Sequence, residues 1–379
     1  MLAQVDPFHA ISISGLAQRL KAEGRSIIHM EFGQPSTGAP APAIAAAHQV
    51  LDTEAMGYWS SQPLKARICR HYAETYGVAV APEQITLTCG ASPALVLALS
   101  ATFQPGDVIA MVRPGYVAYR NTVKALHMVP LEIACGAGTG FQLTATTLAA
   151  LDPAPAGVIL ASPANPTGTV IPGPGLAAIA EVCRDRGIRI ISDEIYHGLT
   201  YAEPAHSMLE FEPRAVVVNS FSKYFSMAGW RLGWLIVPRD EASRAVAYMG
   251  ALFLTAPALA QHAALVAMDC REELEGHLTT YRRNRELLLA ALPGLGLDSI
   301  APPDGAFYIW ADVGAFTDDS LTFCKKLLQD TGVATAPGID FDPIDGHRFI
   351  RLSFAVSTPQ VEDAIRRMAP WFAAAPRGT

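Results

Sequence analysis

The sequence predicts an α/β protein with a mostly parallel central sheet in a large domain and a smaller α+β domain beside it. Strand-like and helix-like segments alternate through the middle of the chain, which is typical of strands joined by helical crossovers. Strand-like runs such as Val158–Ala161 are continuously apolar and therefore suit strands that are buried on both faces. After about residue 285 the pattern changes to aromatic-rich strands around one helix.

Six short apolar runs are the predicted strands of the large domain, and four longer segments are its predicted helices. The helices between the strands supply the crossovers that a parallel sheet needs. The strands are Ile85–Thr88, Val108–Val112, Val158–Ala161, Ile188–Ser192, Val216–Asn219 and Leu232–Val237. The helices are Pro63–Tyr76, Pro93–Phe103, Leu176–Arg186 and Pro257–Leu292.

The smaller domain is predicted from both ends of the chain. Phe307–Trp310 and Phe349–Phe354 are predicted strands, and Ser320–Asp330 between them is a predicted helix. The N-terminal stretch, which is rich in Pro and Gly near its end, is expected to join this unit. The expected division is a large domain over 43–284 and a small domain formed by 1–42 together with 285–379.

Composition excludes several classes of protein. Of the 379 residues, 50% are hydrophobic and 17% are charged, which suits a large buried core and not a disordered chain. The formal net charge of −7 offers no basic surface for nucleic acid. The most apolar stretch, Ala247–Ala260, is too short to span a bilayer, so no membrane association is expected.

Cysteine and histidine spacing gives the expected compartment and excludes a metal site. The cysteines form no CxxC pair and resemble free thiols of a reducing compartment, and the histidines have no metal-ligand spacing. The first residues have neither a basic region nor an apolar signal core, so we expect a cytoplasmic protein. The cysteines are Cys69, Cys89, Cys135, Cys183, Cys270 and Cys324.

Lys223 lies just after the predicted strand Val216–Asn219, with Ser220 and Ser222 before it and Arg231 eight residues after it. A lysine amine condenses with carbonyl compounds when its pKa is depressed. Hydroxyls and a guanidinium bind phosphate. The segment therefore suggests a phosphorylated aldehyde held by an imine to Lys223, a description that fits pyridoxal 5′-phosphate (PLP). The alternative is a solvated turn after a strand.

The ends of two earlier strands carry groups that suit the same ligand, because ligands bind beyond the carboxyl ends of strands in open α/β sheets. Gly90, Ala91 and Ser92 precede an apolar helix, with Ser92 as its expected N-cap, and such a helix start binds phosphate. Tyr116 could stack on an aromatic ring. The alternatives are an ordinary capped helix and a tyrosine that covers the sheet edge.

Two later strand ends add an amide, an acid and a phenol. Asn165 lies in a Pro-fixed turn and offers both a donor and an acceptor. Asp193 ends an apolar strand and needs a partner such as a protonated pyridine nitrogen, and Tyr196 follows three residues later. A turn-forming Asn165 and a helix-capping Asp193 remain the alternatives. The five strand ends together fit one ligand.

These motifs resemble those of the class I/II aminotransferases, the fold-type-I PLP enzymes related to aspartate aminotransferase. The resemblance runs from Phe32-Gly33-Gln34-Pro35 to Arg351-Leu352-Ser353-Phe354. Its most specific parts are Ala161-Ser162-Pro163-Ala164-Asn165-Pro166-Thr167-Gly168, Ser192-Asp193-Glu194-Ile195-Tyr196, Ser220-Phe221-Ser222-Lys223 and Gly229-Trp230-Arg231-Leu232-Gly233.

The resemblance implies a role for each residue. Lys223 would form the Schiff base and shuttle the proton, Asp193 would pair with the pyridine nitrogen, and Asn165 and Tyr196 would bond the phenolic oxygen. Arg351 resembles the arginine that binds the substrate α-carboxylate, and Gly33 would approach the substrate. Tyr116 would stack on the ring, and the phosphate would be held by Gly90, Ala91, Ser92, Ser220, Ser222 and Arg231.

Tyr58 resembles the tyrosine that reaches the cofactor phosphate of a partner subunit, which implies a homodimer. The following stretch to Leu64 departs from the family, because it is shorter and has no glycine. Tyr58, Trp59 and the apolar Ile11–Leu16 segment favour apolar or aromatic substrates. His197 is expected to be a wall residue, and Gly136–Gly140 is expected to be a surface turn and not a dinucleotide loop.

The implied activity is transfer of an amino group between an L-amino acid and a 2-oxo acid by a ping-pong mechanism. A PLP-dependent C–S or β-lyase uses the same core residues and is the alternative. A non-catalytic PLP-binding regulatory module is less consistent with a chain that keeps both Lys223 and Arg351. The sequence does not identify the amino donor or acceptor.

Overall fold

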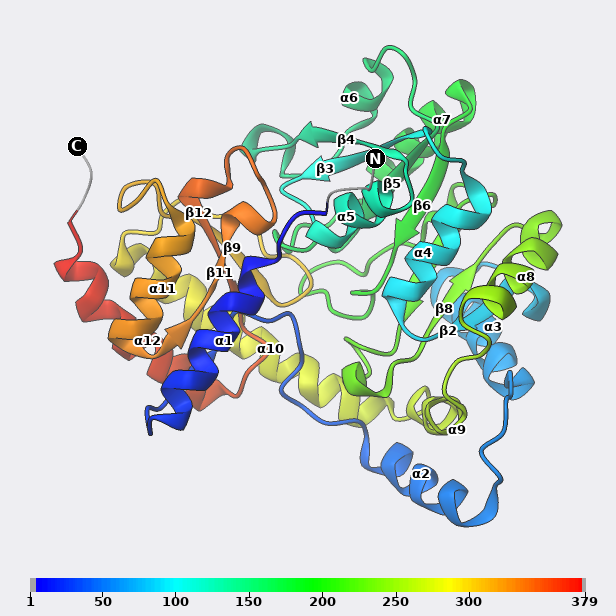
Figure 1. The fold of residues 1–379 in the computed structure, drawn as a ribbon, viewed down its shortest axis with the longest axis horizontal. Helices are drawn as coiled ribbons and strands as arrows, with labels where there is room; N and C mark the ends of the chain where they lie inside the picture. Colours follow the sequence, from blue (N-terminus) through cyan, green and yellow to red (C-terminus); the bar gives the residue numbers. More distant parts are fainter. Residues whose placement is uncertain (1–4, 377–379) are drawn as a thin grey trace.

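The computed structural model describes residues 5–376, and its centre is a seven-stranded sheet of order β2-β8-β7-β6-β5-β3-β4 (Figure 1). Strand β8 runs antiparallel to both of its neighbours, and the other pairs are parallel. The predicted mostly parallel sheet is therefore confirmed. The strands are β2 (Ile85–Thr88), β3 (Val108–Arg113), β4 (Val129–Ala134), β5 (Gly157–Ala161), β6 (Arg189–Asp193), β7 (Val216–Ser220) and β8 (Gly233–Ile236).

Six of these strands coincide with predicted ones to within a residue or so at each end, but β4 was not predicted. Pro130 and Glu132 interrupt its apolar pattern, and Val129 is exposed. The strand lies at the edge of the sheet beside β3, where a proline costs no central ladder hydrogen bond. Strand β4 is buried less than the central strands, so it lacks the apolar run that reveals them.

Both faces of the sheet are buried, as the apolar runs predicted. Adjacent residues of β6 and β7 alternate between two core clusters: Ile190 and Val217 pack in one, Ile191 and Val216 in the other. Helices α2 (Ala41–Thr53), α3 (Gln62–Tyr76), α7 (Gly173–Arg186) and α9 (Ala258–Ala267) contribute to the first cluster. Helices α4 (Ala91–Thr102), α5 (Val117–Ala125) and α8 (Ala242–Leu252) contribute to the second. The short helix α6 (Ala145–Ala149) packs beside α7.

The predicted single helix Pro257–Leu292 is wrong, because the chain forms two helices there. Helix α9 ends at Ala267, and α10 (Arg271–Ala291) starts after a break at Met268–Cys270. Glu272 and Glu273 in the first turn of α10 favour a new helix start. The break lets α9 stay in the core of the large sheet while α10, apart from Leu274 near its start, packs in a separate core.

That separate core combines residues from early and late in the chain, such as Ile13 and Phe372, and the helices that carry them lie on the same side of the molecule (Figure 1). It surrounds an antiparallel sheet of order β11-β12-β9 and a parallel pair β1-β10. The strands are β1 (Ile28–His29), β9 (Tyr308–Asp312), β10 (Val333–Ala334), β11 (Ala336–Pro337) and β12 (Phe349–Ser353). The helices are α1 (His9–Ala22), α10, α11 (Ser320–Thr331) and α12 (Thr358–Ala374).

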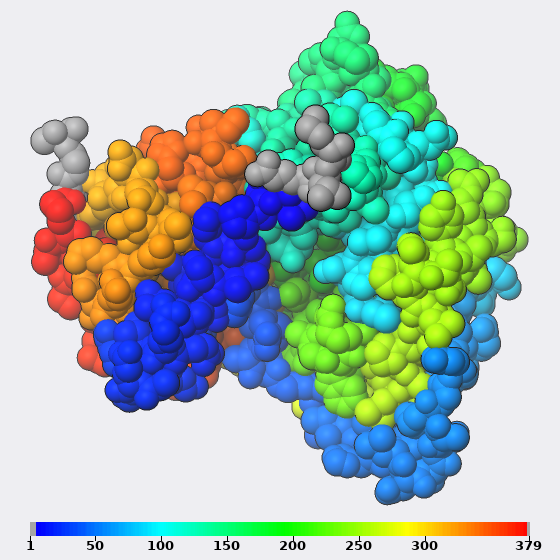
Figure 2. All heavy atoms as spheres, viewed as in Figure 1, coloured from blue at the N-terminus to red at the C-terminus, as the bar shows by residue number. Residues whose placement is uncertain are grey.

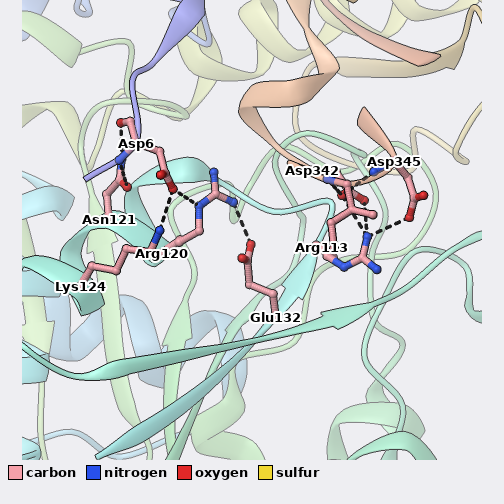
Figure 3. Close-up of polar contacts among 9 residues, drawn as sticks. Asp6, Arg113, Arg120, Asn121, Lys124, Glu132, Asp342 and Asp345 are labelled. Atoms are coloured by element: carbon pink, nitrogen blue, oxygen red, sulfur yellow. Dashed lines mark hydrogen bonds and ion pairs between the residues drawn. The ribbon is translucent and has the colours of Figure 1, made fainter. Parts of the chain in front are cut away.

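Ion pairs join the two parts of the molecule near the ends of β3 and α5 (Figure 3). Asp6 Oδ2 accepts hydrogen bonds from Arg120 Nε at 2.8 Å and Lys124 Nζ at 2.9 Å. Arg113 Nη1 donates to Asp342 Oδ1 at 3.0 Å. These contacts hold the N-terminal segment against α5, and the loop between β11 and β12 against the end of β3. Among residues 5–376, no helix is both long and apolar enough to cross a membrane.

Candidate active site

A cavity of about 430 Å³ lies at the carboxyl ends of the central strands, between the two parts of the molecule. Figure 2 shows the surface hollowed between the blue N-terminal segment and the cyan to green part of the large sheet. A larger depression of about 750 Å³, lined by Tyr76, Arg214 and Asp240, contains no predicted site residue. Eleven predicted residues line the first cavity: Gly33, Ala91, Ser92, Tyr116, Asn165, Asp193, Tyr196, Ser222, Lys223, Arg231 and Arg351.

Lys223 follows β7 and enters this cavity, where its Nζ donates a hydrogen bond to the Gly33 carbonyl oxygen at 2.5 Å. Burial lowers the pKa of Lys223 to about 8, and the positive charges of Arg351 and Arg231 act in the same direction. The charge of Asp193 opposes this shift. A larger fraction of the amine is therefore unprotonated near neutral pH, as a nucleophile or base requires.

The first turn of α4 forms an anion-binding corner beside Arg231. Helix α4 starts at Ala91 with Gly90 as its N-cap, so the predicted N-cap Ser92 is wrong. Gly90 has a φ of 104°, which glycine adopts readily, and Ser92 is already helical. A Cβ on Gly90 would lie 2.5 Å from Arg231 Nη2, so a side chain there would fill the corner. The first backbone N–H groups of a helix have no partner within the helix and favour anions.

Ser220 and Ser222 lie on the other side of this corner. Ser222 lines the cavity, whereas Ser220 is buried behind it. Their hydroxyls are 2.8 Å apart, and Ser220 Oγ donates to the Leu232 carbonyl oxygen at 2.9 Å. Ser220 therefore orients Ser222 and does not itself reach the cavity.

Asp193 ends β6 as a buried carboxylate held by two donors. The Tyr119 hydroxyl donates to Oδ2 at 2.6 Å, and the Ile195 backbone N–H donates to Oδ1 at 3.1 Å. Burial raises the pKa of Asp193, while both hydrogen bonds and the charge of Lys223 oppose that rise. Tyr119 was not predicted, although its spacing of three residues from Tyr116 at the start of α5 was a usable signal.

Tyr196 meets a residue of the smaller sheet that the sequence did not identify. Its hydroxyl lies 2.6 Å from the hydroxyl of Tyr308, which starts β9 and also lines the cavity. Burial raises the pKa of both phenols. Tyr308 belongs to an aromatic strand, Phe307–Trp310, and nothing local distinguishes it from a core residue.

Arg351 of β12 is fully buried beside the cavity. Its Nη1 donates to Asn165 Oδ1 at 2.8 Å, and its Nη2 donates to the Glu31 carbonyl oxygen at 2.5 Å. The guanidinium lies between the rings of Tyr308 and Phe341, at 4.4 and 4.6 Å from their centroids. Its Nε has no hydrogen-bond partner within residues 5–376, and no carboxylate there pairs with it. A buried cation of this kind suits an anionic ligand.

Several predicted residues lie outside the cavity lining. Tyr58 is 83% exposed, and Trp59 stacks on His262 at 4.2 Å. Ile11 is also exposed. His197 is a buried structural residue: its Nδ1 lies 2.7 Å from the Tyr76 hydroxyl, and burial lowers its pKa to about 3.

The rest of the lining is mostly apolar. Phe8, Phe32, Leu95, Ala118 and Ile195 supply apolar surface. The only cations in the described lining are Lys223, Arg231 and Arg351. The pattern Gly136–Gly140 lies away from this lining and forms a short 3-10 turn at Ala137–Thr139.

Comparison with known proteins agrees with this geometry. The family described as aminotransferase class I and II matches residues 25–368. A valine–pyruvate aminotransferase of Mycobacterium tuberculosis is 45% identical over 97% of each chain. A crystal structure of an aminotransferase from Mycobacterium tuberculosis has a TM-score of 0.96 at 44% identity, covering 98% of both chains. Thermus thermophilus aspartate aminotransferase with maleate has a TM-score of 0.91 at 28% identity, covering 97% of both chains.

The family match and the relatives agree with the observed fold. Lys223, Asp193 and Arg351 line one cavity of this fold. Amino-group transfer between an amino acid and a 2-oxo acid is the activity of these proteins. The chain belongs to the class I and II aminotransferases and is an enzyme of that kind.

Proposed function

We propose that this enzyme uses PLP to transfer the amino group of an L-amino acid with an apolar side chain to a small monocarboxylic 2-oxo acid. The observation that carries the proposal is that two functional groups, Lys223 and Arg351, lie in one cavity. Lys223 has a lowered pKa, and Arg351 is a buried cation without a carboxylate partner among the described residues.

The donor set of the cavity fits PLP. The N–H groups at the start of α4, the Ser222 hydroxyl and Arg231 would hold the phosphate. The corner beside Gly90 has no room for a side chain, which suits close approach of a ligand to the backbone. Asp193 has no Lys, Arg or His at ion-pair distance in residues 5–376, so a pyridinium N–H would supply the missing cation. When bound, PLP supplies an electron sink for the electrons of the substrate Cα–H bond.

The remaining groups are proposed to orient substrate and cofactor. Tyr116 would stack on the ring, and Asn165 and Tyr196 would bond its phenolic oxygen. Gly33 would approach the substrate through its backbone, since Lys223 Nζ already contacts its carbonyl oxygen. The amine of Lys223, once free, is the base that would take the proton from the substrate Cα and return one.

The cavity chemistry supports the substrate class. Arg351 would bind the α-carboxylate with two N–H groups, a geometry that suits arginine. Arg231 belongs to the phosphate corner, so no further arginine of the lining remains for a second carboxylate. Phe8, Phe32 and Ile195 offer apolar surface to a side chain. The relative named valine–pyruvate aminotransferase is consistent with this preference.

We also propose that the protein is a homodimer with two domains and that it lies in a reducing compartment. A homodimer is supported by the exposure of Tyr58, because a phenol that is 83% exposed is available to a second subunit. The separate core, to which residues from early and late in the chain contribute, supports a small domain of 1–42 with 285–379 beside a large domain over 43–284. Helix α10 crosses that boundary, because Leu278 and Tyr281 also pack in the separate core. Six free cysteines support a reducing compartment such as the cytoplasm.

The test is a panel of amino donors with pyruvate or 2-oxoglutarate as acceptor, scored for both 2-oxo acid and ammonia. We expect 2-oxo acid without ammonia, with kcat/KM for valine or alanine well above that for aspartate. Stoichiometric ammonia would indicate the β-lyase reaction and contradict the proposal. Lys223→Ala should lose the visible absorbance of bound PLP, whereas Lys65→Ala, at a buried lysine of α3, should keep it.

A further inference from the structure

Tyr308 contacts three groups of the candidate site at once. Its hydroxyl lies 2.6 Å from the Tyr196 hydroxyl, and its ring centroid lies 4.4 Å from the Arg351 guanidinium carbon. A Cβ on Gly33 would lie 1.8 Å from the Tyr308 hydroxyl oxygen, so the Gly33 backbone packs directly against it. Tyr308 itself is fully buried and belongs to β9 of the smaller sheet.

The Tyr308 hydroxyl determines whether the Tyr196 hydroxyl is free to donate its hydrogen to an acceptor in the cavity. Each phenol has one hydrogen to give and can also accept. Within residues 5–376, the hydrogen bond between the two hydroxyls is the only one that either of them forms. If Tyr196 gives its hydrogen to an acceptor in the cavity, the hydrogen between the two phenols must come from Tyr308. A donated hydrogen bond polarises Tyr196 and makes it a stronger donor.

The ring of Tyr308 constrains the carboxylate anchor. Arg351 is held between Tyr308 and Phe341, and its Nη1 and Nη2 are engaged by Asn165 and Glu31. A desolvated cation over an aromatic face is stabilised more strongly than an exposed one. Removal of the Tyr308 ring would free one face of the guanidinium and leave space into which it can rotate.

We propose that Tyr308 is a positioning residue that joins the substrate-carboxylate anchor Arg351 to the cofactor-facing hydroxyl of Tyr196. Its hydroxyl strengthens the hydrogen bond from Tyr196 to the phenolic oxygen of the cofactor, and its ring keeps Arg351 in the plane that a carboxylate requires. The inference rests on the proposed function, because it assigns these two roles within the PLP-dependent site.

Tyr308→Phe tests the hydroxyl alone. The variant keeps the ring, so KM for the amino donor should change less than about twofold. The pH midpoint of the visible absorbance of the PLP-loaded enzyme should move upward by about 0.5 to 1 unit, because the anionic phenolic oxygen loses stabilisation. Tyr281→Phe is the matched control: Tyr281 is buried in the same core, and its hydroxyl bonds Thr37 Oγ1 at 3.0 Å outside the cavity lining. It should leave the midpoint unchanged.

Tyr308→Leu tests the ring. We expect KM for the amino donor to rise by about tenfold or more relative to Tyr308→Phe, with the absorbance midpoint shifted as in that variant. Thermal unfolding and PLP content of both variants identify a protein that has merely lost its fold. A folded, PLP-loaded Tyr308→Phe enzyme with the wild-type midpoint would overturn the hydroxyl role. Equal KM values for the Phe and Leu variants would overturn the ring role.

The same measurements separate this inference from the proposed function. Wild-type protein that develops no visible PLP absorbance would overturn both. Wild-type protein with normal absorbance and transamination, together with variants that show neither shift, would overturn the role of Tyr308 alone.

Discussion

Lys223 Nζ donates a hydrogen bond to the carbonyl oxygen of Gly33, a residue 190 positions earlier in the chain. Lys223 follows the central strand β7, whereas Gly33 lies in the segment that follows β1 of the smaller part. The contact places the amine at the boundary between the two parts of the molecule. A substrate that binds there would therefore meet the lysine from one part and the arginine of β12 from the other.

The pKa of Lys223 predicts how the PLP-free protein reacts with PLP. Only the unprotonated amine attacks a carbonyl, so the rate should rise with pH through about 8 and then level. The charge of Arg351 contributes to lowering this pKa, so Arg351→Gln should move the midpoint to higher pH. Stopped-flow absorbance across roughly pH 6 to 10 measures both midpoints. A wild-type midpoint near the ordinary lysine value would contradict the burial argument.

Arg351 is predicted to bind the substrate carboxylate and not the cofactor. Arg351→Ala should raise KM for the amino donor by about 10²-fold or more, because it removes a buried charged donor pair. Arg351→Lys should recover only part of this loss, since an ammonium lacks the planar fork. Steady-state kinetics and PLP titration check the two expectations. Arg348→Ala, at an exposed arginine paired with Asp312, is the control and should leave KM unchanged. A KM in Arg351→Ala equal to that of the wild type would remove Arg351 from the site.

Asp193 is predicted to act on the cofactor ring. Asp193→Asn keeps the side-chain shape but removes the negative charge, so kcat should fall by roughly 10²-fold or more while PLP still binds. Presteady-state absorbance and kcat measure this effect. Asp185→Asn, at an exposed residue of α7, is the matched control. An Asp193→Asn enzyme with wild-type kcat would exclude the proposed pairing.

A change at Tyr119 provides an independent test of the role of the Asp193 carboxylate. Its hydrogen bond holds the pKa of Asp193 down against the effect of burial. Tyr119→Phe should raise that pKa, so the carboxylate becomes protonated at higher pH and the acid limb of the kcat profile moves upward. A pH–rate profile with an acid limb identical to that of the wild type would argue against this coupling.

Gly33 is predicted to tolerate no side chain. Gly33→Ala places a Cβ 1.8 Å from the Tyr308 hydroxyl oxygen, so Tyr308 or the Gly33 backbone must move. Because small displacements of positioning groups are costly, kcat/KM should fall by about 10²-fold. Gly38→Ala is the control, since a Cβ there meets no atom within 4 Å. Equal losses in both variants would point to a general effect on folding, which thermal unfolding would show.

Much of the fold could be predicted because its signals are local. The buried strands of the central sheet are continuous apolar runs, and the polar residues that follow them converge at one sheet edge, as the lining of the cavity shows. The edge strand β4 was missed because Pro130 and Glu132 interrupt its apolar pattern. The break between α9 and α10 was missed because apolar residues continue on both sides of it.

The sequence by itself determined the sheet, the lysine motif and the residues that follow the strands, because each is encoded in a few consecutive positions. Only the tertiary structure decided which other side chains orient these site residues. Tyr119 meets Asp193 across 74 positions, and Tyr308 meets Tyr196 across 112. Tyr308 also packs on Arg351 from a neighbouring strand. Such contacts depend on how separate elements pack, and no periodicity along the chain records that packing.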